Sequence, residues 1–219
     1  MKSKYIKAIA LAFAVLAITA PGNGCAASAG YKKADKTGAG IADFREEIVI
    51  GQKAIDACMK SLTDIAATAN SDPRKAFKQY TKDVDKLEST AAKIRKRAQN
   101  MREQGQAYFK QWEKELAEVK NEEIRNLATE RKAKLQETFE SIRKYSEPLK
   151  AQFDPWMSDL KDLQRYLSND LTIGGVDAAK SLFSKTTTGG LEVQKSMDAL
   201  VAELNTVAAT ISPAKPGKK

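Results

Sequence analysis

The chain has 219 residues and a formal net charge of +9, with few aromatic residues (7%) and many charged ones (30%). That balance suits long helices with a narrow apolar seam and a wide solvated face, rather than a deep globular core. Histidine is absent, which removes the side chain best suited to proton transfer near neutral pH and the commonest metal ligand. The two cysteines, Cys25 and Cys58, are too few for a multi-thiolate zinc or iron–sulfur site.

The first 24 residues have the organisation of a secretory signal peptide. Three lysines among the first seven residues precede an uncharged apolar run at 8–20, and P-G-N-G follows at 21–24. The run is too short for a comfortable transmembrane span. We therefore expect residues 1–24 to be removed on export, which leaves 34 basic and 28 acidic residues spread along the chain.

Cys25 follows a small residue directly after the apolar run, a pattern that resembles the bacterial lipobox, in which the cysteine is lipidated and becomes the mature N-terminus. Gly22 departs from that pattern, since an aliphatic residue is usual there. Cleavage by an ordinary signal peptidase after Ala27 or Ala29 is the alternative. We predict Cys25 to be the lipid-attachment residue. Residues 25–40, rich in Ala, Gly, Ser and Lys, are predicted to form a flexible tether.

An amphipathic helix is predicted over residues 41–69. Apolar or small residues recur there at alternating steps of three and four, the period of a coiled-coil seam. The seam consists of Ile41, Phe44, Ile48, Gly51, Ile55, Cys58, Leu62, Ile65 and Ala69. A reactive thiol needs an electropositive, partly exposed site. We therefore interpret Cys58 as a core packing residue.

The strongest heptad pattern covers residues 77–119 and predicts a second, longer helix. Its seam consists of Phe77, Tyr80, Val84, Leu87, Ala91, Ile94, Ala98, Met101, Gly105, Tyr108, Trp112, Leu116 and Val119. Asp72 is a candidate N-cap for this helix, and Pro73 a candidate first helical residue. The helix is expected to be interrupted around Asn121.

A third helical segment follows, and we expect it to continue to Leu171. Its first half has an apolar face of Ile124, Leu127, Leu135, Phe139, Ile142 and Tyr145. A kink at Pro148 and a new helix start at Asp154-Pro155 are the alternatives for its second half.

The rest of the chain is predicted to contain a loop at 172–175, a short helix at 176–184, a break at 186–190 and a last helix. The apolar face of the last helix consists of Val193, Met197, Leu200, Leu204, Val207 and Ile211. Residues 212–219, S-P-A-K-P-G-K-K, are predicted to form a disordered basic tail.

No segment shows the period-two alternation of strands, so the predicted fold class is all-α. The seams must bury one another, which predicts an elongated antiparallel helical bundle over residues 41–211 with long coiled-coil helices. The second and third helices are long enough for part of the pair to project as a two-stranded coiled coil.

The sequence carries no motif for catalysis, and we expect no catalytic, cofactor-binding or metal-binding residues. Gly174-Gly175 and Gly189-Gly190 lack the spacing and the flanking strand of a phosphate-binding loop. Adjacent acidic pairs such as Glu122-Glu123 point to different sides of a helix rather than converging. The protein is therefore expected not to be an enzyme.

The densest basic cluster consists of Lys93, Arg95, Lys96, Arg97 and Arg102. Aromatic residues do not interleave with it, and an exported protein rarely meets nucleic acid, so nucleic acid is not an expected partner. A solvated helix face is one interpretation of the cluster. A site for anionic envelope polymers or lipid headgroups is the other.

Three stretches resemble a family of bacterial lipoproteins whose helical domain has no known function. They are W-E-K-E-L at 112–116, L-Q-E-T-F at 135–139 and P-L-K-A-Q-F-D-P-W-M-S-D-L-K-D-L-Q-R-Y-L-S-N-D-L at 148–171. The resemblance covers most of residues 41–211. It implies a helical envelope lipoprotein, and it supplies no catalytic or binding residue.

The sequence therefore favours a non-enzymatic lipoprotein of the bacterial cell envelope, on the periplasmic face of a membrane, or soluble in the periplasm if Cys25 is not lipidated. It is expected to be a helical scaffold or adaptor with a protein partner in the envelope, and a homo-oligomer is a further candidate assembly. The alternative function is binding of membrane lipids or anionic envelope polymers through basic helix faces.

Overall fold

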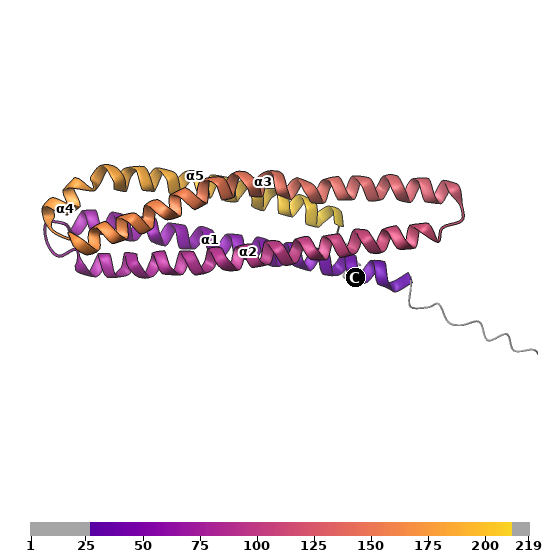
Figure 1. Ribbon diagram of the computed structural model, residues 1–219, viewed down its shortest axis with the longest axis horizontal. Helices are drawn as coiled ribbons and strands as arrows, with labels where there is room; N and C mark the ends of the chain where they lie inside the picture. The colour runs from indigo at the N-terminus through magenta and orange to yellow at the C-terminus, as the bar shows by residue number, and fades with distance from the viewer. Residues whose placement is uncertain (1–26, 212–219) are drawn as a thin grey trace, which may run out of the picture.

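The computed structural model describes residues 27–211, and every regular element in that range is a helix (Figure 1). The elements are α1 (Ala27–Thr68), α2 (Arg74–Ala117), α3 (Glu122–Asn169), α4 (Ile173–Ala178) and α5 (Lys180–Ile211). The predicted signal peptide of residues 1–24, the predicted lipid-attachment residue Cys25 and the predicted tail of residues 212–219 lie outside the described residues.

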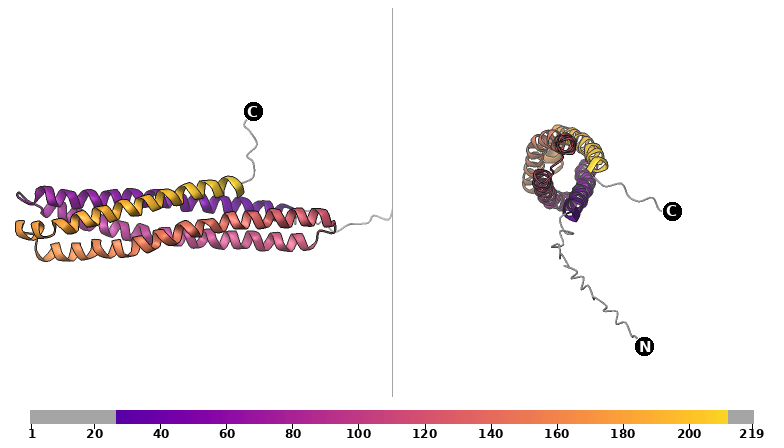
Figure 2. Two further views of the ribbon diagram at one scale, coloured as in Figure 1. Left: turned by 90° about the horizontal axis from the view of Figure 1, so that it is seen from above. Right: turned by 90° about the vertical axis from the view of Figure 1, so that its right-hand side faces the viewer.

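The four long helices alternate in direction and form one elongated antiparallel bundle. Helices α1 and α3 each pack against both α2 and α5, which closes the four into a ring around a common core (Figure 2). The short α4 links α3 to α5 at the end of the bundle where α1 turns into α2 (Figure 1). With 48 residues, α3 is about 70 Å long. The predicted all-α antiparallel bundle is confirmed.

The seams predicted for the first and last helices form the centre of the core. Every predicted seam residue between 41 and 69 is buried, and so is every predicted apolar-face residue of the last helix. Along α2, Leu87 and the tyrosines of the seam are buried, whereas Ile94 and Ala98 are only half-buried. The heptad register is therefore correct, but the seam of α2 is partly open in the middle and at its C-terminal end, where Trp112, Leu116 and Val119 are half-buried.

Polar side chains accept hydrogen bonds at the starts of α2 and α3, but the predicted start of α2 is wrong by one residue, because Pro73 and not Asp72 is its N-cap residue. The Asp72 carboxylate accepts a hydrogen bond from the backbone N–H of Arg74 at 3.1 Å, although α2 itself begins at Arg74, after Pro73. Asn121 caps α3, because its side-chain oxygen accepts from the backbone N–H of Ile124 at 3.0 Å. These bonds satisfy amides that have no partner inside the helix.

The predicted tether over residues 25–40 is wrong for residues 27–40, which form the first turns of α1. Ala34 and Thr37 are buried there, and the Thr37 hydroxyl lies 3.3 Å from the backbone oxygen of Gln104 on α2. A Cβ at Gly40 would lie 2.1 Å from the Gln104 side-chain oxygen. The small residues thus allow close approach of two helices, whereas composition alone suggested a flexible linker.

The predicted break at 186–190 is also wrong, because α5 runs through it without interruption. The Trp156 ring of α3 occupies the space beside the two glycines, and a Cβ at Gly189 would lie 2.8 Å from its Cδ1 atom. The indole N–H of Trp156 donates to the backbone oxygen of Thr186 at 2.7 Å. Each glycine in a helix interior costs about 1 kcal/mol of free energy relative to alanine, and packing against this ring offsets that cost.

The connection before α5 differs in detail from the prediction. The loop predicted at 172–175 ends at Thr172, and α4 begins at Ile173. The Thr172 hydroxyl accepts from the backbone N–H of Gly175 at 3.1 Å, which caps this short helix. The helix predicted over 176–184 is divided between α4 and the first turn of α5, with Ala179 between them.

Both prolines of the third segment lie inside one continuous helix, so no new helix starts at Pro155. Proline has no N–H, so neither Pro148 nor Pro155 can donate to the carbonyl four residues earlier. Such positions bend helices. Figure 1 shows that the second half of α3 slants away from the line of its first half.

Stability measurements can distinguish the closed part of the seam from the open part. We expect Leu87→Ala to lower the free energy of unfolding by about 2–4 kcal/mol, because the Leu87 side chain has only 1% of its surface exposed and its removal enlarges the apolar space beside it. Ile94→Ala should lower it by less than about 2 kcal/mol, because Ile94 already borders open space. Denaturant unfolding followed by circular dichroism gives both values.

The exposed Lys93 and Lys96 flank the same seam and serve as controls. Changing either to Ala should alter stability by less than about 0.5 kcal/mol. Equal losses at Leu87 and at these lysines would contradict the register.

Candidate functional site

The described residues form no cluster suited to metal binding. Within residues 27–211, no group of three or more acidic or cysteine side chains is placed to hold a metal ion. Glu122 and Glu123 occupy the first turn of α3, where negative charge is favourable against the helix dipole. Their position accounts for them as helix-start residues.

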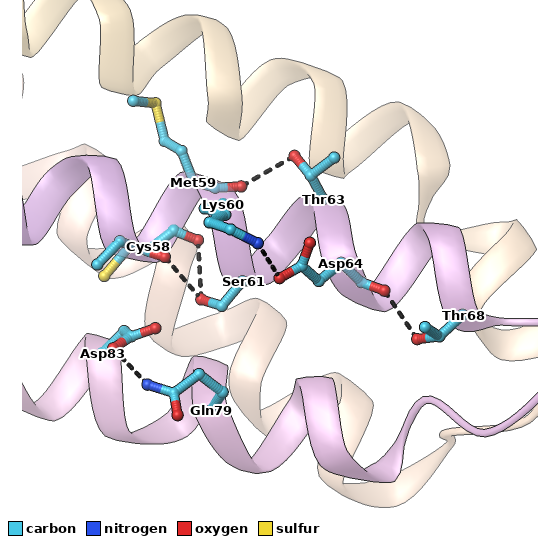
Figure 3. A network of polar contacts seen from close by, with 10 residues as sticks. Cys58, Met59, Lys60, Ser61, Thr63, Asp64, Thr68, Gln79 and Asp83 are labelled. Carbon is cyan, nitrogen blue, oxygen red and sulfur yellow. Dashed lines mark hydrogen bonds and ion pairs between the residues drawn. The ribbon is translucent and has the colours of Figure 1, made fainter.

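Cys58 lies on α1, fully buried and facing α2 (Figure 3). Burial first, and the charge of Asp83 on α2 second, raise the pKa of its thiol to about 12. Burial also raises the pKa of the neighbouring Tyr80, whose hydroxyl donates to the backbone oxygen of Leu160 at 2.8 Å. The interpretation of Cys58 as a core residue is confirmed, and its protonated thiol packs between helices.

Cys58 should therefore react slowly with alkylating reagents while the protein is folded. We expect its alkylation at pH 8 to be slower than in denaturant by a factor on the order of ten or more, because the thiolate is the nucleophile and the raised pKa removes it. Mass spectrometry of iodoacetamide-treated protein with and without denaturant measures both rates. Cys58→Ala should lower stability only modestly. Equal rates in the two states would show an exposed thiol and would contradict the position of α1.

The basic cluster of α2 is partly neutralised within the bundle. Arg95 is paired with Asp154 of α3 at 2.9 Å, and Arg97 with Asp43 of α1 at 3.2 Å. Lys93 and Lys96 are exposed. Two arginines of the cluster are therefore paired with acidic residues on two different helices, α3 and α1, and the cluster does not form one continuous cationic face.

The hairpin of α2 and α3 reaches past the other helices at one end of the bundle (Figure 1). Helix α1 begins at the same end, since the Lys33 ammonium donates to the Gln111 side chain at 3.2 Å and a Cβ at Gly30 would lie 2.8 Å from Glu115. Helix α5 ends before this point (Figure 1). The start of α1 and the hairpin turn thus share one end of the molecule.

The hairpin tip, residues 119–134, exposes apolar side chains that the sequence assigned to the core. Ile124 and Leu127 have 54% and 68% of their surface exposed, so their predicted burial is wrong. Tyr145, further along α3, is exposed as well. The heptad pattern already weakens here, since the step from Leu127 to the next seam residue, Leu135, is eight positions instead of three or four. That gap was the available signal that this stretch has no helix packed over it.

None of the helices among the described residues has a stretch both long and apolar enough to span a bilayer.

The fold and its surfaces define an elongated all-α bundle with exposed apolar residues at both ends and no group of side chains placed to hold a metal ion among residues 27–211. The chain belongs to the DUF2959 family, whose model, described as a protein of unknown function, matches residues 24–212. The predicted resemblance to a helical domain without known function is confirmed to that extent. Comparison with curated proteins and with solved structures gave no match.

Proposed function

We propose that this protein is a non-enzymatic lipoprotein of the bacterial cell envelope that acts as a rigid adaptor between a membrane and a protein partner. One observation carries the proposal: the start of α1 and the exposed hairpin tip lie at the same end of one rod. Cys25 stands two residues before the first residue of α1. A lipid on Cys25 would therefore hold the tip close to the membrane surface.

The rod shape gives the adaptor its reach. Helix α1 has 42 residues, which corresponds to about 63 Å, and its other end carries the turn into α2. With the tip at the membrane, that turn and α4 would extend roughly this far into the periplasm. The tip would thus present its apolar side chains to a partner beside the membrane, while the rest of the stiff helical body stands away from the membrane.

The tip supplies the surface for the partner. Ile124 and Leu127 are exposed apolar side chains on a segment that extends beyond α1 and α5 (Figure 1). Exposed apolar patches rimmed by polar residues mark interaction sites. The alternative, binding of lipids or anionic polymers through the basic face of α2, has less support because Arg95 and Arg97 already have acidic partners in the bundle.

The membrane attachment predicts a defined mature N-terminus. We expect protein isolated from its own envelope to lack residues 1–24 and to carry a lipid on Cys25. Intact mass measurement and sequencing of the N-terminal peptide determine both. An intact Met1 would contradict export, and a free N-terminus at Ser28 or Gly30 would contradict lipidation but leave export standing.

The adaptor role predicts that the tip is needed for partner binding. With the double variant Ile124→Ser/Leu127→Ser, the amount of partner recovered by cross-linking and affinity purification from native envelopes should fall at least about tenfold. The reason is that buried apolar anchors supply most of the binding energy of an interface. Quantitative mass spectrometry of the captured proteins measures the loss.

The matched control is Ile173→Ser/Leu182→Ser, because these residues are similarly exposed, at 52% and 48%, near α4 at the opposite end. It should retain the partner. If both variants lose the partner to the same extent, or if neither loses it, the proposed role of the tip is contradicted. Capture that disappears only as salt is raised would favour the basic-face alternative.

A further inference from the structure

The bundle contains an apolar groove of about 330 Å³ between α2 and α3, near the middle of the rod. Its floor consists of buried side chains from the other helices, including Ile48 and Ile55 of α1 and Leu200 of α5. Its walls are Ile94 of α2 and Leu149 of α3, both half-buried. The groove is therefore continuous with the hydrophobic core.

The groove exists because α2 and α3 both lack buried residues at the same position along the rod. No residue of α2 is fully buried between Ala91 and Met101, and none of α3 between Ile142 and Trp156. The second of these stretches contains Pro148. On both sides of the groove, α2 and α3 contact each other again. On one side the Tyr80 hydroxyl of α2 donates to a backbone oxygen of α3, and on the other side Phe139 of α3 packs against α2.

Basic residues surround the mouth of this groove. Arg95, Arg102, Arg143 and Lys150 line it together with two acidic residues, so its rim has an excess of two positive charges. Arg95 is paired with Asp154 at 2.9 Å and Arg143 with Glu147 at 2.6 Å.

The two basic residues left over give the rim its positive character. Among residues 27–211, no ion pair involves Arg102 or Lys150. These two side chains come from the two opposite walls, one from α2 and one from α3. An anion at the mouth would therefore meet two cations that the bundle has not neutralised.

The size of the groove limits what can fill it. Ligand sites range from roughly 300 to 1,000 Å³, so this one is at the small end. A partner helix measures about 10–12 Å across with its side chains, too wide for this space, and a lipid with two acyl chains needs more volume as well. A single flexible hydrocarbon chain meets the limit.

We propose that this groove binds one acyl chain of an anionic amphiphile, with the chain over Ile94 and Leu149 and the headgroup between Arg102 and Lys150. A fatty acid and a monoacyl phospholipid share this chemistry. The inference does not depend on the adaptor function or on the modification of Cys25.

Cis-parinaric acid is a suitable probe, because its acyl chain is fluorescent and its headgroup is a carboxylate. The purified full chain in detergent-free buffer should show saturable fluorescence with this probe. Ala98→Phe, which places a ring in the half-buried wall of the groove, should weaken binding at least about tenfold. Ala107→Phe, at an exposed position of the same helix, should bind as the unchanged protein does.

A second pair of variants tests the headgroup and keeps the proposal testable if Ala98→Phe fails to fold by circular dichroism. Arg102→Glu/Lys150→Glu should weaken binding of the probe at least about tenfold. Lys93→Glu/Lys96→Glu makes the same change in net charge at exposed positions outside the groove, and it should leave affinity within about twofold.

Displacement identifies the source of the ligand. Dodecanoate and a monoacyl phosphatidylglycerol should both displace the probe, and the one effective at lower concentration is the favoured source. Neutral dodecanol should be much weaker.

Absence of saturable binding, or equal binding by Ala98→Phe when that variant is folded, would overturn the proposal. Displacement by dodecanol as strong as by dodecanoate would overturn the headgroup assignment. A dimer of the unchanged chain that Ala98→Phe dissociates, without probe binding, would assign the groove to a second copy instead.

Discussion

Burial of one continuous apolar seam on α1 is the interaction on which the rest of the bundle depends. Ile41, Ile48, Ile55 and Ile65 have no exposed surface, and α1 packs against both α2 and α5. Each such side chain contributes about 1.5–3 kcal/mol of transfer free energy when fully buried. Without α1, two neighbouring helices would each lose the surface that covers their seams.

The surfaces with functional potential lie where the packing of the other helices departs from this complete burial. At the hairpin tip, α2 and α3 extend beyond α1 and α5, which leaves Ile124 and Leu127 in contact with solvent. In the middle of the rod, both helices lack buried residues at one level, and the groove opens between them. Burial of the apolar seams holds the bundle together, and these two apolar surfaces remain where that burial is incomplete.

These two surfaces suit different partners, because their surroundings differ. The tip is a projecting hairpin at the end where α1 begins, and it is accessible to a large molecule. The groove is small, continuous with the core and rimmed by excess positive charge, so it suits a narrow anionic chain. The proposed acyl-chain site in the middle of the rod and the proposed partner surface at its end are therefore separate on the molecule.

The sequence by itself determined the fold class, the seams of the first and last helices and the core position of Cys58, since a period of 3.5 residues specifies which residues must face inward. Only the tertiary structure decided what covers each seam. Residues 27–40 and Gly189-Gly190 are helical because α2 and Trp156 pack closely against their small side chains. Ile124 and Leu127 are exposed because α1 and α5 both end before the hairpin tip (Figure 1). A periodic pattern shows that a face is apolar, but burial depends on the lengths and ends of the neighbouring helices.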